Sequence, residues 1–562
     1  MSVVSLAVKE GNPVTEDTVR RLGKKISTGM EFKNEQDVKD YTAILAAFHD
    51  SVDSILAMDD YIPPSLKPDL ERFPRENISF PKKGSDAHKR KNSRKGLLEG
   101  KTVVLKDCIS VAGVPCTLGT DAISPPWTPF VDATVVTRVL EAGGIIAGKA
   151  STESMCQSAS SFTSVTGPVD NPYAPGRTSG GSSSGCGALV ADGSCDMAIG
   201  ADQGGSIRMP SAFCGLVGIK PTFGLVPYTA IASNEWQHDY AGPMCRTVHD
   251  AALLLQVIAG ADGLDDRSGA GCPFPLDVPP YPSLLSIPGA DPVVPLKGKR
   301  IGILKEAFMM PVLDPRVADK VKQAAELFRD LGATVEEVSI PLHSIAPTIW
   351  MAANRYAGGK TRLGEASGHR QYYQNDLHNL LFPLTQERWE KFIPATINSQ
   401  LNSLYGWENM SGVYGKAMNK LMEIQHAYNA ALDNLDCLIL PTVAFVANTH
   451  PSPNATALQK IQKSVGQGLN CCTFNGTGHP ALTLPIGTLP PAESDWVTEK
   501  DAELKLPVGM QIVGKWWDET GILQIANAWE QKYNWKILLV LGIPIFIYDI
   551  NQNYAVTHTV FG

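Results

Sequence analysis

Apolar residues recur at helical spacing near the start of the chain. Within residues 35–58 they fall three or four positions apart, which gathers them on one face of a helix. Residues 14–26 carry Thr15, a residue type that caps helices, near their start, and acidic residues follow it directly. Prolines cluster after residue 62 and end this pattern. The sequence therefore predicts a helical N-terminal extension over residues 1–95.

Short apolar runs then alternate with helical patterns along the chain. Runs bounded by turn-forming or charged residues are typical of buried strands, and strands alternating with helices favour an α/β fold. The predicted strands are residues 101–105, 143–147, 197–201, 300–304, 334–338, 437–443, 481–485 and 510–513. The predicted helices are residues 133–142, 314–331, 372–428 and 519–533.

The composition is that of an ordinary globular protein. Of the 562 residues, 43% are hydrophobic and 19% are charged, so a large buried core is possible. The formal net charge of −8 gives no reason to expect nucleic acid or an anionic membrane as a partner. The basic segment 82–95 has no interleaved aromatic residues, so we expect a solvated loop there. The longest apolar run, residues 537–547, contains Pro544 and is too short to span a bilayer.

The eleven cysteines are scattered and form no CxxC pair or Cys/His zinc pattern. An odd number of cysteines in a large chain favours free thiols in a reducing compartment, with no metal. The first eleven residues carry no basic segment and only a short apolar one. We therefore expect no secretory signal and a cytoplasmic protein.

Glycine and serine gather in residues 176–221, first at 180–187 and again at 204–206. A predicted strand leads into the second cluster, where Ser206 follows two glycines. Glycines leave backbone N–H groups unobstructed, so those of Gln203 through Ser206 could converge on one oxyanion. A serine nucleophile is the first hypothesis, and a plain glycine-rich turn is the alternative.

Two other local matches are weaker. Residues 143–150, GGIIAGKA, approach the phosphate-binding loop GxxxxGK[ST], but Ala150 replaces the hydroxyl that binds magnesium. Residues 181–185, GSSSG, fit the GxSxG elbow that would make Ser183 a nucleophile. That elbow needs a buried strand directly before it, and we expect a loop over residues 171–176. Neither a nucleotide site nor an elbow is predicted.

A longer, ordered set of motifs resembles the amidase signature family. The set comprises VVLKD (103–107), GGSSSG (180–185), DQGGSIRMPSAFCGLVGIKPTFGLVP (202–227), GPM (242–244), FNGTGHPALTLP (474–485) and LPVGMQIVG (506–514). These segments follow the family's order and together cover roughly residues 95 to 535. So long an ordered set is not expected by chance.

The resemblance implies a large twisted mixed β-sheet covered by helices on both sides, in a catalytic domain spanning residues 96–536. It also implies a Ser–cis-Ser–Lys triad, in which Ser206 is the nucleophile, Ser182 the cis-serine and Lys106 the base. The peptide bond before Ser182 is then cis. No metal or organic cofactor is needed.

The same resemblance assigns further residues to the site. The oxyanion and the substrate are then bound by Gln203, Gly204, Gly205 and Ser182. The supporting residues are Ser183, Asp202 and Arg208, and we expect Arg208 to pair with a neighbouring carboxylate.

A lysine base must be neutral to accept a proton. Burial without a carboxylate partner disfavours the ammonium and lowers the pKa of a lysine from about 10.4. We therefore expect a lowered pKa for Lys106 and an activity that rises between roughly pH 6 and roughly pH 8. Cys108, two residues further on, is expected to be a packed thiol and is the next nucleophile to test if the serine assignment fails.

Within the family, the resemblance is strongest to nitrile-pathway amidases, which are enantioselective on aliphatic and aryl amides. The markers are Gln203 and the segment GLVPYT, residues 224–229. The implied reaction releases a carboxylic acid and ammonia from a small-molecule amide through an acyl-enzyme. In that subgroup the N-terminal extension commonly serves dimerisation, so a homodimer is implied. Two features depart from the family pattern. The pair Asp239-Tyr240 stands where the family usually has Asp-His. The tail, residues 537–562, has no counterpart in the family and is either an extra strand or a gene-model artefact.

Two other functions stay open at this point. The chain could be the glutamine-hydrolysing amidase subunit of a tRNA-dependent amidotransferase, or a relative that binds without hydrolysing. The acyl pocket is expected within residues 344–422. Large apolar side chains there favour an apolar or aromatic acyl group, although each could belong to the core: Trp350, Met351, Tyr356, Tyr372 and Trp407.

Overall fold

The computed structural model describes residues 5–26, 31–56, 58, 96–269, 271–362, 369 and 372–537. The basic segment 82–95 and the tail from residue 538 onward lie outside these residues. The predictions made for both segments therefore stay predictions.

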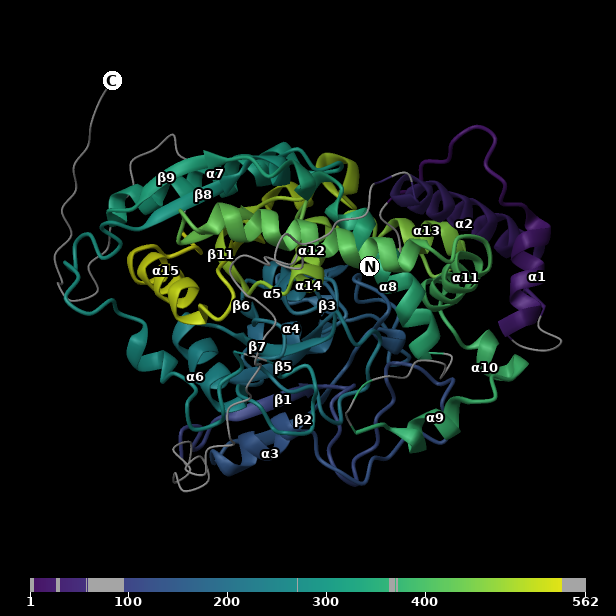
Figure 1. Ribbon diagram of the computed structural model, residues 1–562, viewed down its shortest axis with the longest axis horizontal. Helices are drawn as coiled ribbons and strands as arrows, with labels where there is room; N and C mark the ends of the chain where they lie inside the picture. The colour runs from purple at the N-terminus through teal and green to yellow at the C-terminus, as the bar shows by residue number, and fades with distance from the viewer. Residues whose placement is uncertain are drawn as a thin grey trace, which may run out of the picture.

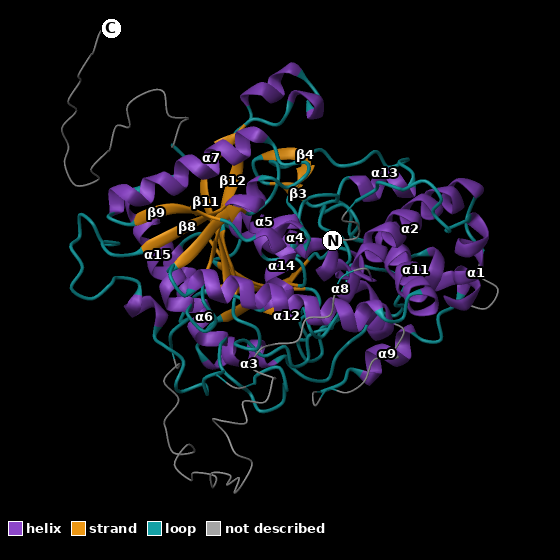
Figure 2. Ribbon diagram, turned by 45° about the horizontal axis from the view of Figure 1, so that its top comes forward, coloured by secondary structure: helices purple, strands orange, loops and turns teal. Residues whose placement is uncertain are grey.

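A ten-stranded mixed sheet forms the centre of the molecule (Figure 2). Its strands are β1 (Thr102–Lys106), β2 (Ile145–Ala150), β5 (Met197–Asp202), β6 (Val217–Lys220), β7 (Tyr240–Cys245), β8 (Arg300–Leu304), β9 (Thr334–Val338), β10 (Cys437–Pro441), β11 (Ala481–Leu489) and β12 (Leu506–Val513). They lie in the order β2-β1-β5-β7-β6-β11-β12-β10-β8-β9. Pairing is parallel near both ends of the sheet and antiparallel in its middle.

The predicted strands are confirmed, with shifted ends. Strands β5, β10 and β12 are buried along their whole length, so both faces of each carry apolar residues. This is why they stand out in the sequence as continuous runs. The expected loop at residues 171–176 is wrong, because β3 (Asp170–Asn171) and β4 (Ala174–Thr178) form a separate two-stranded sheet there.

Helices cover the sheet in two groups. Helices α3 (Thr134–Glu141), α6 (Val248–Ile258), α15 (Glu519–Lys532) and α7 (Pro315–Glu326) contact one another in that order. Helices α4 (Ser184–Ala191) and α5 (Arg208–Phe213) also contact each other, and both groups contact β7, β11 or β12. Two groups that share strands without sharing a contact lie on opposite faces of the sheet, as the family resemblance implies.

The N-terminal extension packs against helices from the second half of the chain at one end of the molecule (Figure 1). Helix α2 (Glu35–Leu56) contacts α8 (Ala346–Arg362), α11 (Pro394–Asn409), α12 (Val413–Leu432) and α13 (Ala457–Gln462). Helix α1 (Glu16–Ile26) contacts α2 and α11. The apolar face predicted for residues 35–58 is thus buried within one chain, and dimerisation through this extension stays a prediction.

The region predicted as helical over residues 372–428 is confirmed as a series of helices. It contains α9 (Asn375–Leu381) and α10 (Gln386–Glu390), followed by α11 and α12, and α14 (Leu469–Thr477) lies further on. Among the described residues, no helix combines the length and the apolar character needed to cross a bilayer.

Candidate active site

Lys106, Ser182 and Ser206 come from three separate parts of the fold. Lys106 is the last residue of β1, Ser182 lies between β4 and α4, and Ser206 lies in the turn between β5 and α5. Strands β1 and β5 are parallel neighbours, so their carboxyl ends reach the same edge of the sheet. All three side chains are buried. Crevices at this edge of α/β sheets are where ligands usually bind.

Lys106 and Ser182 are in direct contact. The Lys106 Nζ donates to Ser182 Oγ at 2.7 Å and to the backbone oxygen of Ala201 at 3.1 Å. The peptide bond preceding Ser182 is cis, as expected. The carbonyl oxygen of Ser182 itself accepts hydrogen bonds from Thr152 Oγ1 at 2.8 Å and from the N–H of Glu153 at 3.2 Å. The segment after β2 therefore holds the backbone at Ser182.

The charges around Lys106 differ from the expectation. Burial lowers the pKa of its ammonium, but the Cys156 thiolate and the Asp202 carboxylate are among the groups that raise it, and the balance lies above the ordinary value. The expected lowered pKa is therefore wrong for the substrate-free protein. A hydrogen bond from Cys108, together with the charge of Lys106, lowers the pKa of Cys156 to about 6 despite burial. Burial raises the pKa of Cys186 to about 12, so at neutral pH the thiolate beside Lys106 is that of Cys156.

A buried ion pair holds the turn that carries Ser206. Arg208 donates to the two carboxylate oxygens of Asp202 at 3.0 and 3.1 Å, and neither side chain is exposed. Burial raises the pKa of Asp202, but the Arg208 charge and several hydrogen bonds outweigh it, so the pKa lies well below its usual range. Asn475 joins the pair by donating to Asp202 at 2.8 Å and accepting from Arg208 at 2.6 Å. The expected contact between Arg208 and a carboxylate is present.

The predicted oxyanion donors need one correction. The N–H of Gly205 donates to Asp202 Oδ1 at 2.7 Å, so it is committed to holding the turn. Gln203, Gly204 and Ser206 are the remaining candidate N–H donors. A Cβ at Gly204 would lie 2.7 Å from the ring of Trp350, so only glycine fits there. Trp350, expected to line the acyl pocket, instead packs against this turn.

Ser183 links the two glycine-serine clusters. Its Oγ donates to the carbonyl of Ala201 at 3.2 Å, and its N–H donates to the carbonyl of Ser206 at 3.4 Å. Strand β4, which precedes it, belongs to the separate two-stranded sheet. Ser183 therefore does not sit on an elbow at the edge of the central sheet. Ser184 is the first residue of α4.

A cavity of about 340 Å³ lies beside the site. Cys108 and Cys156, both neighbours of Lys106, line it. So does Asn234, whose Nδ2 donates to the side chain of Gln203 at 2.7 Å. The other side chains that line it come mainly from residues 228–236 and 361–382.

This cavity overlaps only in part with the acyl pocket expected within residues 344–422. Of the five side chains named for that pocket, Tyr372 lines the cavity. Tyr356 and Trp407 instead pack against each other, with ring centroids 5.2 Å apart. Met351 is buried in the core.

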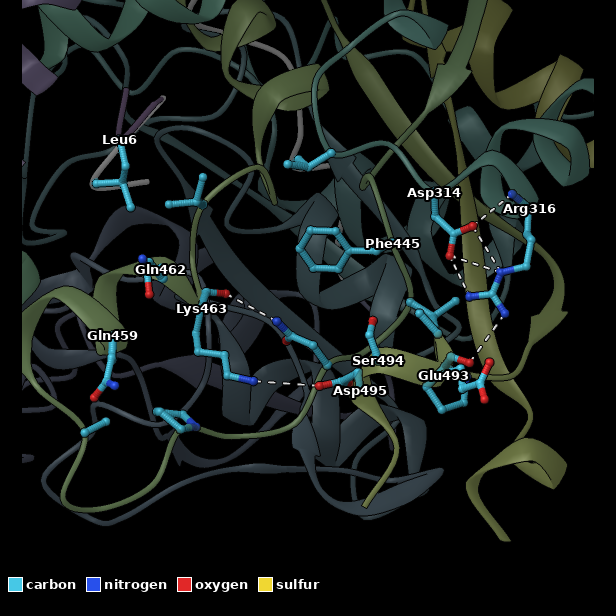
Figure 3. Close-up of a pocket in the computed structure, with 18 of the residues that line it drawn as sticks. Leu6, Asp314, Arg316, Phe445, Gln459, Gln462, Lys463, Glu493, Ser494 and Asp495 are labelled. Atoms are coloured by element: carbon cyan, nitrogen blue, oxygen red, sulfur yellow. Dashed lines mark hydrogen bonds and ion pairs between the residues drawn. The ribbon is translucent and has the colours of Figure 1, made fainter. Parts of the chain in front are cut away.

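A larger cavity of about 1160 Å³ lies elsewhere and contains none of the predicted site residues (Figure 3). Phe445 and Lys463 line it, together with Asp495, which lies 3.7 Å from the Lys463 Nζ. Neither cavity is lined by a residue of the triad. The smaller one is the candidate for substrate because Cys108 and Cys156, beside Lys106, and Asn234, which binds Gln203, line it.

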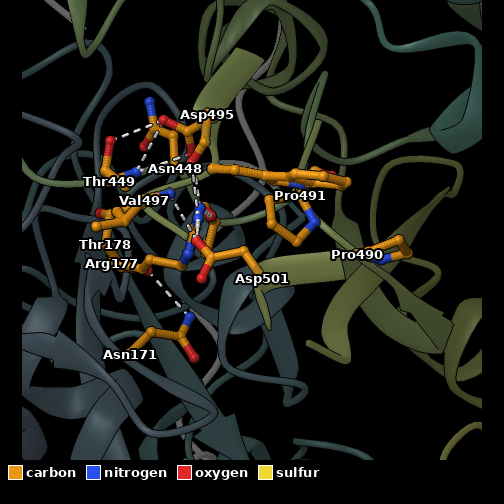
Figure 4. A network of polar contacts seen from close by, with 12 residues as sticks. Asn171, Arg177, Thr178, Asn448, Thr449, Pro490, Pro491, Asp495, Val497 and Asp501 are labelled. Atoms are coloured by element: carbon orange, nitrogen blue, oxygen red, sulfur yellow. Dashed lines mark hydrogen bonds and ion pairs between the residues drawn. The ribbon is translucent and has the colours of Figure 1, made fainter. Parts of the chain in front are cut away.

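Beneath the larger cavity, Arg177 of β4 holds a buried network (Figure 4). Its guanidinium donates to Asp495 and to Asp501, each at 2.6 Å, and to the carbonyl of Ala447 at 3.1 Å. Arg177 lies five residues before Ser182 in the sequence. The network therefore anchors the strand that leads into the cis-serine loop.

A family model described as "Amidase" matches residues 71–523. The chain belongs to this family. It is similar to an enantioselective amidase from Rhodococcus rhodochrous, with 38% identity over 444 residues that cover 77% of this chain and 80% of that protein. It is also similar to a glutamyl-tRNA(Gln) amidotransferase subunit from Cyanothece sp., with 32% identity covering 78% of this chain and 85% of that protein. The solved structure of the native peptide amidase from Stenotrophomonas maltophilia has a TM-score of 0.60 and 27% identity, over 77% and 82% of the two chains.

As a member of the amidase family, the protein is a hydrolase of C–N bonds. The departure from the family pattern at Asp239-Tyr240 lies close to the site. Tyr240 donates its hydroxyl to the carbonyl of Asn475 at 2.8 Å, and burial raises the pKa of Asp239 to about 6. Both residues thus support segments next to the nucleophile turn.

The sequence reasoning missed several residues of this amidase's site. Asn475 lies inside the recognised motif FNGTGHPALTLP, and a buried amide within a motif signals a polar role. Thr152 and Cys156 follow β2, at the same sheet edge as Lys106. Arg362 is the last residue of α8, and a charged residue on the buried face of a helix is itself a sign that could have been noticed in the sequence.

Proposed function

We propose that this amidase hydrolyses a carboxamide to a carboxylic acid and ammonia through an acyl-enzyme on Ser206. In this proposal Ser182 is the proton relay and Lys106 the base. The observation that carries the proposal is the buried 2.7 Å contact between Lys106 Nζ and Ser182 Oγ, next to the turn that bears Ser206. A serine hydroxyl becomes a good nucleophile only when a neighbouring base takes its proton.

The reaction follows from these roles. Neutral Lys106 takes the proton of Ser182 while Ser182 takes that of Ser206, and Ser206 Oγ attacks the carbonyl carbon. The N–H groups of Gln203, Gly204 and Ser206 are proposed to bind the oxyanion. The C–N bond then breaks as Ser182 returns a proton to the nitrogen, which leaves as ammonia. Water attacks the resulting ester through the reverse relay and releases the acid.

The protonation state of Lys106 sets the pH dependence of this reaction. Because the surrounding charges raise the pKa of Lys106, the ammonium predominates at neutral pH and only a minority of molecules holds the neutral base. The proposal therefore requires an activity that keeps increasing above neutral pH.

Direct measurement of ammonia release tests the proposal. Purified protein is incubated with a panel of aliphatic, aryl and indolyl primary amides and with L-glutamine, in the absence of any partner protein. We expect release from one or more of the amides, its loss in Ser206→Ala, and a large reduction in Lys106→Ala with the fold retained. Full activity in Lys106→Ala would refute the triad.

The glutamine-hydrolysing function remains the second candidate, because the amidotransferase protein from Cyanothece sp. is 32% identical to this chain. The same panel separates the two functions. Ammonia release from glutamine alone among the substrates would favour the amidotransferase function. A fluorophosphonate probe that labels wild type but not Ser206→Ala would exclude a relative that binds without hydrolysing.

A further inference from the structure

Two cysteines lie side by side next to Lys106. Cys108 lies just after the end of β1 and Cys156 lies after the end of β2, and these two strands are parallel neighbours. The thiol of Cys108 donates a hydrogen bond to the sulfur of Cys156. This bond brings the two sulfur atoms into contact, and the proposed reaction uses neither of them. Both residues line the smaller cavity.

Cys156 is the member of the pair that a small reagent in the cavity can reach. It is 8% exposed, whereas Cys108 is fully buried. Its φ of 54° lies in the left-handed region, which residues other than glycine rarely adopt, so the surrounding structure fixes this conformation. The hydrogen bond from Cys108 and the charge of Lys106 lower the pKa of Cys156 to about 6. The thiolate, which is the form that reacts with hydroperoxides, therefore predominates at neutral pH.

The thiolate of Cys156 also acts on the base of the proposed reaction. Its charge is the largest of those that favour the Lys106 ammonium. The carboxylate of Asp202 acts in the same direction, and it is already paired with Arg208 at 3.0 Å. Removing the charge of Cys156 would therefore leave more of Lys106 as the neutral base at a given pH.

The other titratable groups around this cluster carry no net charge at neutral pH. A hydrogen bond to Cys156, together with burial, raises the pKa of Cys108, and burial raises the pKa of Cys186 to about 12. Asp107 and Lys149, which also face the cysteines, form an ion pair at 3.1 Å. Among these groups in the described part of the chain, Cys156 is the one that combines a negative charge with a place in the cavity lining.

We propose that Cys108 and Cys156 form a redox modification site, at which a hydroperoxide converts the pair to a disulfide and thereby raises amidase activity at neutral pH. The Cys156 thiolate attacks the terminal oxygen of the hydroperoxide, the O–O bond breaks, and the leaving oxygen anion takes a proton from water. The Cys108 sulfur then attacks the resulting sulfenic sulfur, the S–O bond breaks, and the hydroxyl leaves with the Cys108 proton as water. The two sulfurs lose two electrons in total, and the hydroperoxide gains them.

The disulfide removes the charge of Cys156 and adds no atom to the cavity. An opposite charge close to a titratable group shifts its pKa by about one unit or more, so the neutral fraction of Lys106 at pH 7 should increase about tenfold. This effect on activity rests on the proposed function. A mixed disulfide at Cys156 differs, because it fills the cavity and because its exchange with Cys108 needs a thiolate that the raised pKa of Cys108 disfavours.

Peroxide treatment at pH 7 tests this site. Purified protein is incubated with hydrogen peroxide, the excess is removed with catalase, and peptide mass mapping and ammonia release from the best amide are measured. We expect the loss of two hydrogen atoms, mapped to a crosslink between the peptides that contain Cys108 and Cys156. We expect kcat/KM at pH 7 to increase about tenfold. Dithiothreitol should reverse both changes.

Two variants separate the roles of the cysteines. Cys108→Ser lacks the second thiol, so peroxide should carry Cys156 on to the sulfinic acid, which keeps a negative charge beside Lys106 and is not reversed by dithiothreitol. Activation should then be lost, and activation of the wild-type size would overturn the disulfide. The matched control is Cys186→Ser. Cys186 also faces Lys106 and is as buried as Cys108, but it does not line the cavity, so crosslink and activation should both persist.

The outcomes distinguish this site from the proposed function. A crosslink in a protein that hydrolyses no amide would refute the proposed function and leave the redox site standing. Amide hydrolysis without a crosslink, or with only sulfinic acid at Cys156, would overturn the redox site and leave the amidase proposal intact. A crosslink that leaves kcat/KM at pH 7 unchanged or lower would overturn the activating role.

Discussion

Selective modification of Cys156 is the sharpest prediction about the chemistry beside Lys106. The Cys156 sulfur lines the smaller cavity, and its side chain is 8% exposed, so a small reagent that enters the cavity can reach it. Cys108 donates a hydrogen bond to this sulfur and the charge of Lys106 lies close to it, so its thiolate is stabilised. A group attached to this sulfur would fill space next to Lys106 and block the substrate.

The lowered pKa of Cys156 gives the magnitude. With a pKa of about 6, half of this thiol is ionised at pH 6, compared with about 0.3% for an ordinary cysteine of pKa about 8.5. A thiolate of lower pKa is intrinsically less nucleophilic, by roughly tenfold for this difference. The net advantage at pH 6 is therefore about tenfold over an ordinary thiol. Burial raises the pKa of Cys186 to about 12, so that thiol is essentially unreactive under these conditions.

The assay uses methyl methanethiosulfonate, a small neutral reagent whose mixed disulfide is reversed by dithiothreitol. Amidase activity is followed between pH 5 and pH 8, and peptide mass mapping identifies the modified cysteine. We expect inactivation with a midpoint near pH 6, full recovery with dithiothreitol, and resistance in Cys156→Ser. Cys272→Ser, which removes a half-buried thiol outside the cavity, should be inactivated like wild type.

Two results would refute this reasoning. One is an inactivation midpoint above pH 8, which would mean that the thiol of Cys156 has an ordinary pKa. The other is inactivation that persists in Cys156→Ser, which would place the reactive group elsewhere.

Three further predictions concern charge. Because the pKa of Lys106 is raised, kcat/KM should still be rising at pH 8, and Cys156→Ser should shift the profile to lower pH; a plateau by pH 7 would contradict this. Arg177→Met removes the guanidinium that joins Asp495 and Asp501, so urea unfolding should show a lower midpoint, and an unchanged midpoint would contradict the anchoring role. Asp202→Asn leaves Arg208 buried without its counterion and should lose about 3–5 kcal/mol at pH 7. The folded pKa of Asp202 is depressed, so its stabilisation is present above about pH 4 and is lost as pH falls; the gap between Asp202→Asn and wild type should narrow at pH 3.

Eight of the ten strands of the sheet could be predicted from the sequence as apolar runs bounded by turn-forming or charged residues. Strands β6 and β7 were not predicted, although both are buried along their whole length. Residues 300–304 and 334–338 coincide with β8 and β9, and the family's motifs named Lys106 and Ser182, which the structure brings into contact. Helices α4 and α5 were not predicted, since they are short and rich in small residues. Such segments become helical through packing on the sheet, and local propensity contributes little.

The sequence by itself determined the fold class and the family and named the candidate serine and lysine residues of the site, because each depends on local patterns and ordered motifs. Tertiary structure alone decided the charge state around Lys106, since Cys156 meets it only after β1 and the segment following β2 come together. The tertiary structure also decided that the N–H of Gly205 donates its hydrogen bond to the carboxylate of Asp202. Tyr228, Arg362 and Leu377, which line the smaller cavity, come from segments far apart in the chain, so no sequence pattern could reveal that they share one space. Electrostatic fields and cavities depend on distances in the folded molecule, and spacing along a chain does not encode those distances.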